Sequence, residues 1–396
     1  MQQAAVTIIG SGMAAYFLAM ELRRCDAKIP IIILCENDGR FYPKPGLSSA
    51  LYNQKKPAQL VTASAAAMAE KYDLQIETFA KVEQIDDSRQ QLFYQQNGQQ
   101  KHHAYQQLVL ATGSKPKAIA IPGAELCYRV NSLEDYERLL PRLQTIGKIT
   151  IIGAGLVGVE FAHDCIHAGY AVEMIAANPE ALPGLVPASA GRRIREHLCG
   201  LGVRWHNVSQ IDRIVQAQAG LQIHSPEMTH NADIILLATG LSANTDLTPA
   251  DQPQWRGPHG FIVDRYARLS AKVYALGDCA CIDNSHFTYV APIKKQVAAL
   301  AQTLLGKPTT ISYPPMPVGL KTPTLPCSII PVRIYQPGKW EDIQVEQDAY
   351  VSVYRDQKQQ VHGVVLIGKA VASRDEWIAK MPPYLPGFAP DESSKT

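Results

Sequence analysis

The feature that most constrains this chain is a glycine-rich turn that occurs twice, each time between an apolar segment and a helical one. The first turn reads Gly10-x-Gly12-x-x-Ala15, and the second reads GAGLVG over residues 153–158. They lie about 140 residues apart, so this is a repeated function and not a short-period repeat. The apolar runs before them, residues 4–9 and 148–152, are short and rich in β-branched residues, which is typical of buried parallel strands.

The segments after the turns complete two βαβ units. Helical patterning covers residues 13–24 and 156–167, and apolar strands follow at residues 29–34 and 171–175. The first unit is about thirty residues long, as a crossover unit requires. We therefore predict an α/β protein with doubly wound parallel sheets, built as two Rossmann-like domains.

Two later strands share the same exit. Residues 107–111 end in Thr112-Gly113 and residues 232–238 end in Thr239-Gly240, and we expect each to be the last strand of its sheet. A further strand at residues 272–276 leads into Gly277-Asp278.

The end of the chain has a different composition. A helix is expected over residues 291–305, prolines crowd residues 314–331, and strand-like runs follow at 349–354 and 361–367. We predict a small α+β C-terminal domain there, with a loosely anchored polar tail from Pro386. The expected domains are a first nucleotide domain in two parts, a second one inserted into it, and this C-terminal domain, at residues 1–114, 242–312, 115–241 and 313–396 respectively.

Bulk properties exclude several classes of protein. The 396 residues carry a net charge of +2, which gives no reason to expect a nucleic acid partner. No apolar run reaches about 18 residues, so no membrane span is expected, and the cytoplasm is the default location.

Eight scattered cysteines contain no C-x-x-C pair and no metal-ligand spacing, so no metal site is predicted. Cys35, Cys165 and Cys199 lie in apolar patterns and are expected to be buried free thiols, and the Cys279-x-Cys281 spacing does not suit a redox pair.

The first glycine turn has the features of a dinucleotide site. Gly10 permits the tight turn, Gly12 lets the backbone approach a pyrophosphate, and Ala15 keeps the helix close to the sheet. Glu36, about twenty residues on, stands at the end of the second strand, where a carboxylate accepts hydrogen bonds from ribose hydroxyls. Asn37 and Asp38 are alternatives for the same task.

The second turn, with Gly153, Gly155 and Gly158, should also bind a dinucleotide. After its second strand come Ala176, Ala177 and Asn178, with neither an acid for a ribose nor an arginine for a 2′-phosphate. A nicotinamide nucleotide is therefore expected, and NADH is favoured over NADPH only because positive charge is missing.

In combination these motifs resemble the two-dinucleotide flavoprotein reductases over residues 4–312. The resemblance includes the late segment YALGDCA, in which Gly277 and Asp278 would contact the flavin's ribityl chain, and the exit Thr112-Gly113 as part of the same site. It implies FAD in the first domain and NADH in the second.

Two proline-rich segments narrow the resemblance. GRFYPKPGLSS, from residue 39, is similar to the matching segment of rubredoxin and ferredoxin reductases, and MPVGLKTPTLP, from residue 316, resembles rubredoxin reductases. Relatives that use sulfur carry a cysteine in this turn or a C-x-x-x-x-C near the first helix. In this chain the turn reads Leu47-Ser48-Ser49-Ala50, so Ser49 stands where the resemblance would place the sulfur. Because a hydroxyl has no thiolate or disulfide states, electrons must leave the flavin directly for an external acceptor.

The resemblance also implies catalytic residues. Glu160 is expected near the nicotinamide, and the proline-framed Lys44 and Lys321 are expected near the flavin, where they would stabilise negative charge.

The implied acceptor is rubredoxin or a similar small acidic carrier, which would dock on a basic face with a salt-sensitive affinity. The candidate cations for that face are Arg40, Lys44, Lys55, Lys56, Lys294 and Lys295. Three alternatives remain open: a ferredoxin reductase of an oxygenase system, an NADH oxidase or quinone reductase, and a redox-sensing flavoprotein without turnover.

Overall fold

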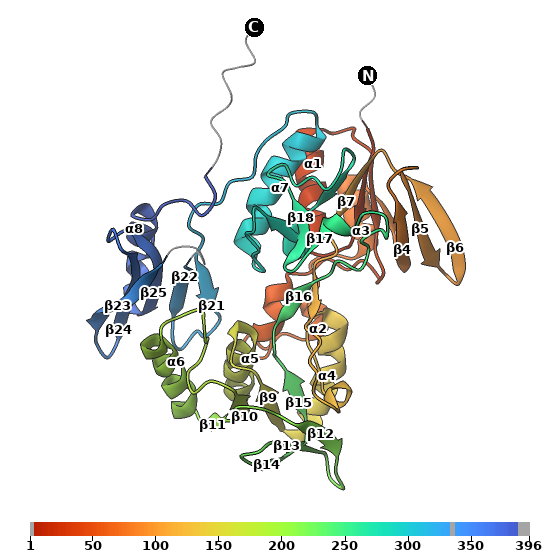
Figure 1. Cartoon of the computed structure of the whole chain (residues 1–396). Coiled ribbons are helices and arrows are strands. Elements are labelled where there is room, and N and C mark those ends of the chain that lie inside the picture. Colours follow the sequence, from red (N-terminus) through yellow and green to blue (C-terminus); the bar gives the residue numbers. More distant parts are fainter. Residues whose placement is uncertain (1–3, 333–336, 387–396) are drawn as a thin grey trace.

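The computed structural model describes residues 4–332 and 337–386. Figure 1 shows three parts: a domain at the top that holds both the start of the chain and residues up to about 310, a domain at the bottom from the middle of the chain, and a smaller one at the side from the end of the chain. Part of the polar tail predicted from Pro386, residues 387–396, lies outside the described residues.

The upper domain is built on a five-stranded parallel sheet in the order β19-β7-β1-β2-β3. Its strands are β1 (Val6–Ile9), β2 (Ile31–Leu34), β3 (Gln75–Glu77), β7 (Gln107–Leu110) and β19 (Val273–Ala275). β1, at the centre of the sheet, is completely buried. Helices α1 (Met13–Cys25) and α7 (Val290–Leu304) contact each other and belong to the same hydrophobic core as these strands (Figure 1).

Smaller elements surround this sheet. They are the helices α2 (Pro57–Leu60) and α3 (Ala65–Tyr72), the antiparallel sheet of β4 (Ala80–Asp86), β5 (Gln91–Gln96) and β6 (Gln99–Ala104), and the sheet of β17 (Arg256–Gly257), β18 (Gly260–Val263) and β20 (Ala280–Ile282).

The lower domain repeats the plan with a parallel sheet in the order β11-β10-β9-β15. Its elements are α4 (Leu133–Ile146), β9 (Lys148–Ile152), α5 (Leu156–His167), β10 (Ala171–Ala176), α6 (Ala188–Gly200), β11 (Arg204–Asn207) and β15 (Ile235–Leu237). A three-stranded antiparallel sheet packs against it through a shared hydrophobic cluster, and consists of β12 (Arg213–Gln216), β13 (Leu221–His224) and β14 (Thr229–Ala232).

The chain passes between the two domains through one antiparallel ribbon. Strand β8 (Ser114–Pro116) leaves the upper domain, and β16 (Leu241–Ala243) pairs with it on the return. The boundaries expected from the sequence, 114/115 and 241/242, fall on these two strands.

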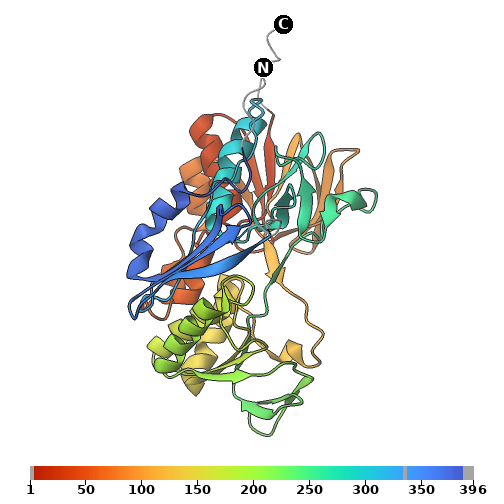
Figure 2. The ribbon, with the colours of Figure 1, turned by 60° about the vertical axis from the view of Figure 1, so that its left-hand side comes forward.

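The C-terminal domain is a five-stranded antiparallel sheet in the order β21-β22-β25-β24-β23. Its elements are β21 (Val318–Leu320), β22 (Cys327–Ile330), β23 (Gly338–Val345), β24 (Ala349–Asp356), β25 (Val361–Gly368) and the short helix α8 (Arg374–Ala379). Residues of this sheet belong to the hydrophobic clusters of both other domains, and Figure 2 shows the sheet lying alongside the upper domain and above the helices of the lower one.

The predicted fold class is confirmed, with one error in the first sheet. β15 is the edge strand of the lower sheet, as expected, but β7 lies between β1 and β19 and is therefore not the last strand of the upper one. The error arose because β19 comes about 165 residues after β7 in the sequence, beyond the inserted domain, and local patterning does not report such long-range pairing.

Among residues 4–332 and 337–386, no helix combines the length and the apolar character that crossing a membrane requires.

Candidate functional site

The first glycine turn fits a group that lies against its backbone. Gly10 has φ +117, and a Cβ there would stand 2.4 Å from the carbonyl oxygen of Ala111. Gly12, by contrast, is exposed, and a Cβ on it would meet nothing within 4 Å. The N-terminus of α1 therefore opens onto free space, which suits the approach of a pyrophosphate to its N–H groups. Ala15 is fully buried on the side that faces the sheet.

The end of β2 supplies the polar side of this site. Glu36 is exposed and lies 3.6 Å from the Nζ atom of Lys81. Beside it, the Asn37 side-chain oxygen accepts a hydrogen bond of 2.8 Å from the Ser11 hydroxyl. Ser11 lies between the two glycines, so this bond ties the turn to the acidic end of β2. The sequence analysis did not identify Ser11, because a serine between two glycines has no distinctive pattern.

Asp278 lies near the start of α1, because the preceding residue, Gly277, packs so closely against that helix that no side chain would fit there. With φ +82, a Cβ on Gly277 would stand 2.8 Å from the Cβ atom of Ala14 in the first turn of the helix. The Asp278 carboxylate accepts a hydrogen bond of 2.9 Å from the Ser114 hydroxyl. The Thr112 hydroxyl donates a hydrogen bond of 2.7 Å to the carbonyl oxygen of Asn244. This bond joins the end of β7 to the chain that returns from the lower domain.

Lys44 is half-buried, and the charge of the same carboxylate acts on its ammonium. Burial lowers the pKa of Lys44 below its ordinary value, and the charges of Asp278 and Asp135 act in the opposite direction. Gly12, Asp278 and Lys44, which are far apart in the sequence, therefore border one region of the upper domain.

The second glycine turn has nearly the same backbone. Gly153 has φ +111, and a Cβ on it would stand 2.5 Å from the carbonyl oxygen of Ala238, while Gly155 again faces open space. Gly158 differs from its counterpart Ala15, because a Cβ on Gly158 would stand 1.9 Å from the Gly153 carbonyl oxygen. Beyond β10, Ala177 and Asn178 are exposed and provide no charge.

Glu160 is the centre of a polar cluster that joins all three domains. It is buried, with its side chain 5% exposed, and forms an ion pair with the Nζ atom of Lys321 from the C-terminal domain. The Lys321 backbone N–H donates a hydrogen bond of 3.2 Å to the other oxygen of the Glu160 carboxylate. Ser48, which belongs to the upper domain, donates a hydrogen bond of 2.7 Å from its hydroxyl to the Glu160 carboxylate. The structure thus brings together Glu160, Lys321 and Ser48. Ser49, which stands where related proteins carry sulfur, has its hydroxyl 3.4 Å from the carbonyl oxygen of Gly46 instead.

The next turn of α5 continues this buried polar face. Asp164 accepts hydrogen bonds from the backbone N–H groups of Leu51 and Tyr52, at 3.1 and 2.7 Å. Burial raises the pKa of Asp164 to about 6, although these two bonds act against the shift.

Three histidines surround the hydroxyl of Thr324 from the C-terminal domain. Their Nε2 atoms lie at 2.9 Å for His163, 2.8 Å for His197 and 3.4 Å for His167. Burial, helped by the two neighbouring imidazoles, lowers the pKa of His163 to about 4. Sequence reasoning missed this group because the histidines face a loop about 130 to 160 residues away.

Two of the cations proposed for a docking face are not exposed on the surface. Arg40 is wrong for that role, because its guanidinium contacts Asp38, Glu134 and Glu137, at 2.6, 3.3 and 2.8 Å, and so links the upper domain to α4. Lys44 is half-buried, as described. The other four candidates are exposed: Lys55, Lys56, Lys294 and Lys295.

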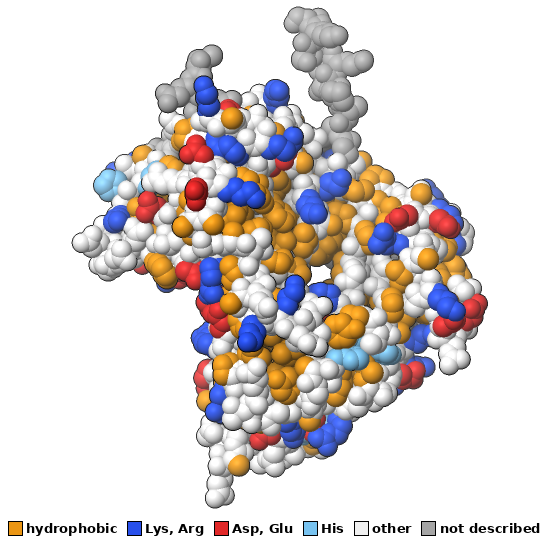
Figure 3. Space-filling model, turned by 180° about the vertical axis from the view of Figure 1, so that it is seen from behind, with side chains coloured by type: hydrophobic (Ala, Val, Ile, Leu, Met, Phe, Trp, Pro, Cys, Tyr) orange, Lys and Arg blue, Asp and Glu red, His pale blue; other side chains and the backbone are white. Residues whose placement is uncertain are grey.

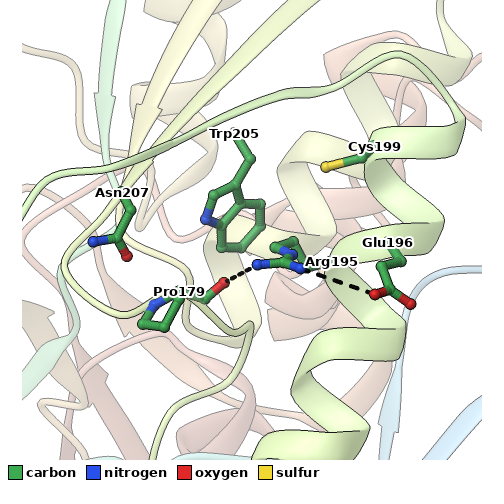
Figure 4. Close-up of a pocket in the computed structure, with 6 residues that line it drawn as sticks. All are labelled: Pro179, Arg195, Glu196, Cys199, Trp205 and Asn207. Carbon is green, nitrogen blue, oxygen red and sulfur yellow. Dashed lines mark hydrogen bonds and ion pairs between the residues drawn. The ribbon is translucent and has the colours of Figure 1, made fainter.

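The burial predicted for three cysteines is confirmed at two of them and wrong at Cys199. Cys35 and Cys165 are buried, but Cys199 is exposed near the end of α6. It borders a pocket of about 330 Å³ that Pro179, Arg195 and Trp205 also line, and Figure 4 shows this pocket between α6 and the ends of β10 and β11. None of the site residues predicted from the sequence lines it.

Figure 3 shows a hollow where the parts of the molecule meet, seen from behind, with mainly hydrophobic side chains around it and Lys or Arg side chains at its rim. Such a composition suits a flat aromatic ring with a charged attachment.

Comparisons with known proteins agree with this geometry. Residues 4–303 match the pyridine nucleotide-disulphide oxidoreductase family, and residues 310–381 match the rubredoxin binding C-terminal domain. Among curated proteins, a rubredoxin-NAD(+) reductase of Acinetobacter baylyi is 34% identical over 388 residues, which cover 96% of this chain and 98% of that one. A nitric oxide reductase FlRd-NAD(+) reductase of Vibrio vulnificus is 31% identical over 92% of this chain and 95% of its own length.

Solved structures share the fold at low identity. An NADH:rubredoxin oxidoreductase from Clostridium acetobutylicum matches with a TM-score of 0.78 and 19% identity, covering 98% of this chain and 97% of that one. A ferredoxin reductase from Rhodopseudomonas palustris matches with a TM-score of 0.84 and 19% identity, with 96% of each chain covered.

Proposed function

The chain belongs to the pyridine nucleotide-disulphide oxidoreductase family and, within it, to the rubredoxin reductases, and on this premise we propose that it passes electrons from NADH through FAD to a rubredoxin or a similar small acidic carrier. The observation that carries the proposal is the contact at Glu160. There a residue of the rubredoxin-binding C-terminal domain, Lys321, pairs with an acid of the second nucleotide domain beside a turn that contains no sulfur.

FAD would be held by the first domain. Gly10, Gly12 and Ala15 form the open helix start, Glu36 is available to the ribose, and Asp278 to the ribityl chain, with Thr112, Gly113 and Gly277 shaping the backbone around it. Support comes from the free space over Gly12, from the packing of Gly277, next to Asp278, against α1, and from the influence of the Asp278 charge on Lys44.

NADH would be held by the second domain, at the turn of Gly153, Gly155 and Gly158. FAD, when bound, supplies the chemistry that the side chains lack, because a flavin accepts two electrons from a nicotinamide and releases them singly. The residues of this chain bind the two nucleotides, orient them toward each other and exclude water between them.

Lys44, Lys321 and Glu160 are proposed to be the catalytic residues. A desolvated ammonium stabilises a developing negative charge more strongly than a solvated one, and Lys44 is half-buried, with its pKa lowered by burial. Lys321 is neutralised by Glu160, and Ser48 orders the same carboxylate, so this trio would position the nicotinamide end of the site.

The absence of a thiol from residues 41–52 leaves no sulfur relay there, so electrons would pass straight to the acceptor. We also propose that the protein works in the cytoplasm, where a reducing environment keeps its free cysteines as thiols.

The decisive experiment measures NADH turnover with a panel of acceptors: rubredoxin, ferredoxin, a quinone and oxygen. We expect rubredoxin to give the highest kcat/KM, and raised salt to increase its KM because the docking cations are exposed. Faster turnover with ferredoxin, quinone or oxygen would replace this proposal by the matching alternative.

Lys44→Ala tests the placement of the flavin. We expect acceptor reduction to slow by roughly tenfold or more, with a shift of the flavin potential, since one charge beside the ring is lost. Lys28→Ala, at an exposed lysine of the same domain that is not among the docking cations, is the matched control. If Lys44→Ala kept both the rate and the potential of the parent protein, its catalytic role would be rejected.

A further inference from the structure

The second nucleotide domain carries a cluster of ligand-type side chains away from the glycine turns. Glu173 on β10, His206 on β11 and His230 on β14 each offer one ligand atom, and these atoms all lie within 4.8 Å of one another. We propose that these three side chains bind a divalent transition-metal ion, and that Zn²⁺ suits them best because it favours imidazole nitrogen and carboxylate oxygen in a compact tetrahedral set.

The sheet register explains why the three residues meet. Glu173 pairs with Arg204 and Ile175 pairs with His206, so Glu173 and His206 point to the same face of the parallel sheet. That face packs against the small antiparallel sheet, in which β14 presents His230. The three residues are spread over 58 positions of the chain, which is why no ligand spacing was evident in the sequence.

The distances are close to those that a metal would impose. Oε2 of Glu173 lies 2.6 Å from Nε2 of His230 and 3.9 Å from Nε2 of His206. Tetrahedral zinc with bonds of about 2.0–2.1 Å separates its ligand atoms by roughly 3.3 Å. The observed pair of distances brackets this value, so shifts of less than about 1 Å would complete the site.

The same three atoms lack any other partner. Oε2 of Glu173 and Nε2 of both histidines are buried and have no hydrogen bond among the described residues, and the 2.6 Å contact does not have hydrogen-bond geometry. Buried polar atoms are nearly always paired, so three such atoms that converge on one point need a common partner.

The surrounding charges orient the carboxylate. Its other oxygen, Oε1, forms an ion pair with Arg204 and lies 3.6 Å from Lys148. These two cations leave Oε2 as the oxygen directed at the histidines, as outer-shell partners do in known metal sites. Their repulsion of a metal ion is reduced by solvent, because the side chains of Arg204 and Lys148 are 64% and 30% exposed.

The site is also accessible. The side chain of His206 is 29% exposed, so an ion can enter beside β11, and three protein ligands leave a fourth position for water. A bound ion would connect β14 to the parallel sheet and stabilise the second nucleotide domain by mass action.

Calorimetric titration of the FAD-loaded protein with Zn²⁺, after treatment with a chelator, tests the proposal. We expect one ion per chain, and we expect His206→Ala and His230→Ala each to weaken binding by about 100-fold or more. His224→Ala is the matched control, because His224 lies on β13 of the same small sheet but outside the cluster. This variant should bind Zn²⁺ with the same affinity as the parent protein.

A second measurement guards against misfolded variants. Zn²⁺ should raise the melting temperature of the parent protein and of His224→Ala, but not that of His206→Ala, whose bound FAD and circular dichroism should be unchanged. The proposal would be overturned by parent protein that binds no Zn²⁺, or by a double variant of His206 and His230 that binds it equally well.

Discussion

The two glycine turns of this molecule are nearly identical in backbone and different in side chains. Each first glycine has a left-handed φ, +117 at Gly10 and +111 at Gly153, and each would place a Cβ about 2.5 Å or less from the carbonyl oxygen that ends a neighbouring strand. Each second glycine is exposed over open space, and φ is −75 at both Gly12 and Gly155. Holding a pyrophosphate is a backbone task, so it was solved in the same way in both domains.

The differences begin three residues later. Ala15 and Gly158 are equivalent, and so are Phe17 and Glu160, five residues after the second glycine. In the first helix these positions only pack, whereas in the second the buried carboxylate of Glu160 contacts Ser48 and Lys321. The comparison teaches that the first unit is shaped to retain a nucleotide and the second to bring one into contact with reactive groups.

The largest expected effect distinguishes the nucleotides that the two turns bind. Gly12→Glu and Gly155→Glu each place a bulky negative charge in the open space over a helix start. We expect Gly12→Glu to yield protein without FAD, and Gly155→Glu to yield yellow protein that dithionite reduces but NADH does not. The ratio of visible to ultraviolet absorbance and anaerobic reduction measure this. Exchange of the two outcomes would reverse our assignment of the domains.

The third position of the turn gives a smaller effect. Gly158→Ala places a methyl group 1.9 Å from the Gly153 carbonyl oxygen, so α5 must move, and we expect kcat/KM for NADH to fall by roughly tenfold. The matched change Ala15→Gly removes a methyl group from α1 and should cost about 1 kcal/mol of stability with kcat/KM unchanged. Steady-state kinetics and urea unfolding measure the two quantities. Equal effects on NADH kinetics would show that the packing of the two helices is not specialised.

The pH dependence of stability should come from the second unit. The pKa of His163 falls to about 4 from an ordinary 6.5, so its stabilising contribution is complete above pH 6.5 and is lost as the pH falls toward 4. The pKa of Asp164 rises to about 6 from an ordinary 3.8, so its contribution is complete below pH 3.8 and is lost as the pH rises toward 6. The contribution of each residue to the free energy of unfolding amounts to roughly 3 kcal/mol. The two contributions change in opposite directions with pH.

Single variants should expose each contribution. Asp164→Asn should lose stability more steeply than the parent protein as the pH falls from 6.5 to 4, and His163→Gln should gain stability over the same range. His102→Gln, at an exposed histidine of the first domain, is the control. Urea unfolding midpoints measured with saturating FAD report the result, and parallel pH profiles for all four proteins would contradict it.

The smallest test concerns the end of the second strand. Leu34 and Ile175 occupy equivalent places beside the central strands, so Ala177 stands where Glu36 stands in the first unit. Ala177→Glu should raise the ratio of kcat/KM for NADH to that for NADPH by several-fold, because a carboxylate accepts from ribose hydroxyls and repels a 2′-phosphate. Ala177→Gln provides the uncharged control. An unchanged ratio would mean that the adenosine ribose lies elsewhere.

Local sequence was sufficient for most elements. β9 and α5 begin and end at the predicted residues, because a continuous apolar strand, a glycine turn and a helical pattern follow one another directly. The position of β7 was wrong and Cys199 was misjudged. In both cases the answer depended on which distant segment, if any, covers the residue, and periodicity does not carry that information.

The sequence by itself determined the two dinucleotide turns, the absence of a thiol from residues 41–52 and the resemblance to flavoprotein reductases. These follow from residue type and close spacing, because a glycine is required wherever a Cβ has no room. Only the tertiary structure decided that Glu160 meets Lys321 and Ser48, that Arg40 is held by acids of α4, and that Glu173 meets two histidines. Such contacts join residues far apart in the chain, and they depend on sheet register and domain packing, which no short stretch of sequence encodes.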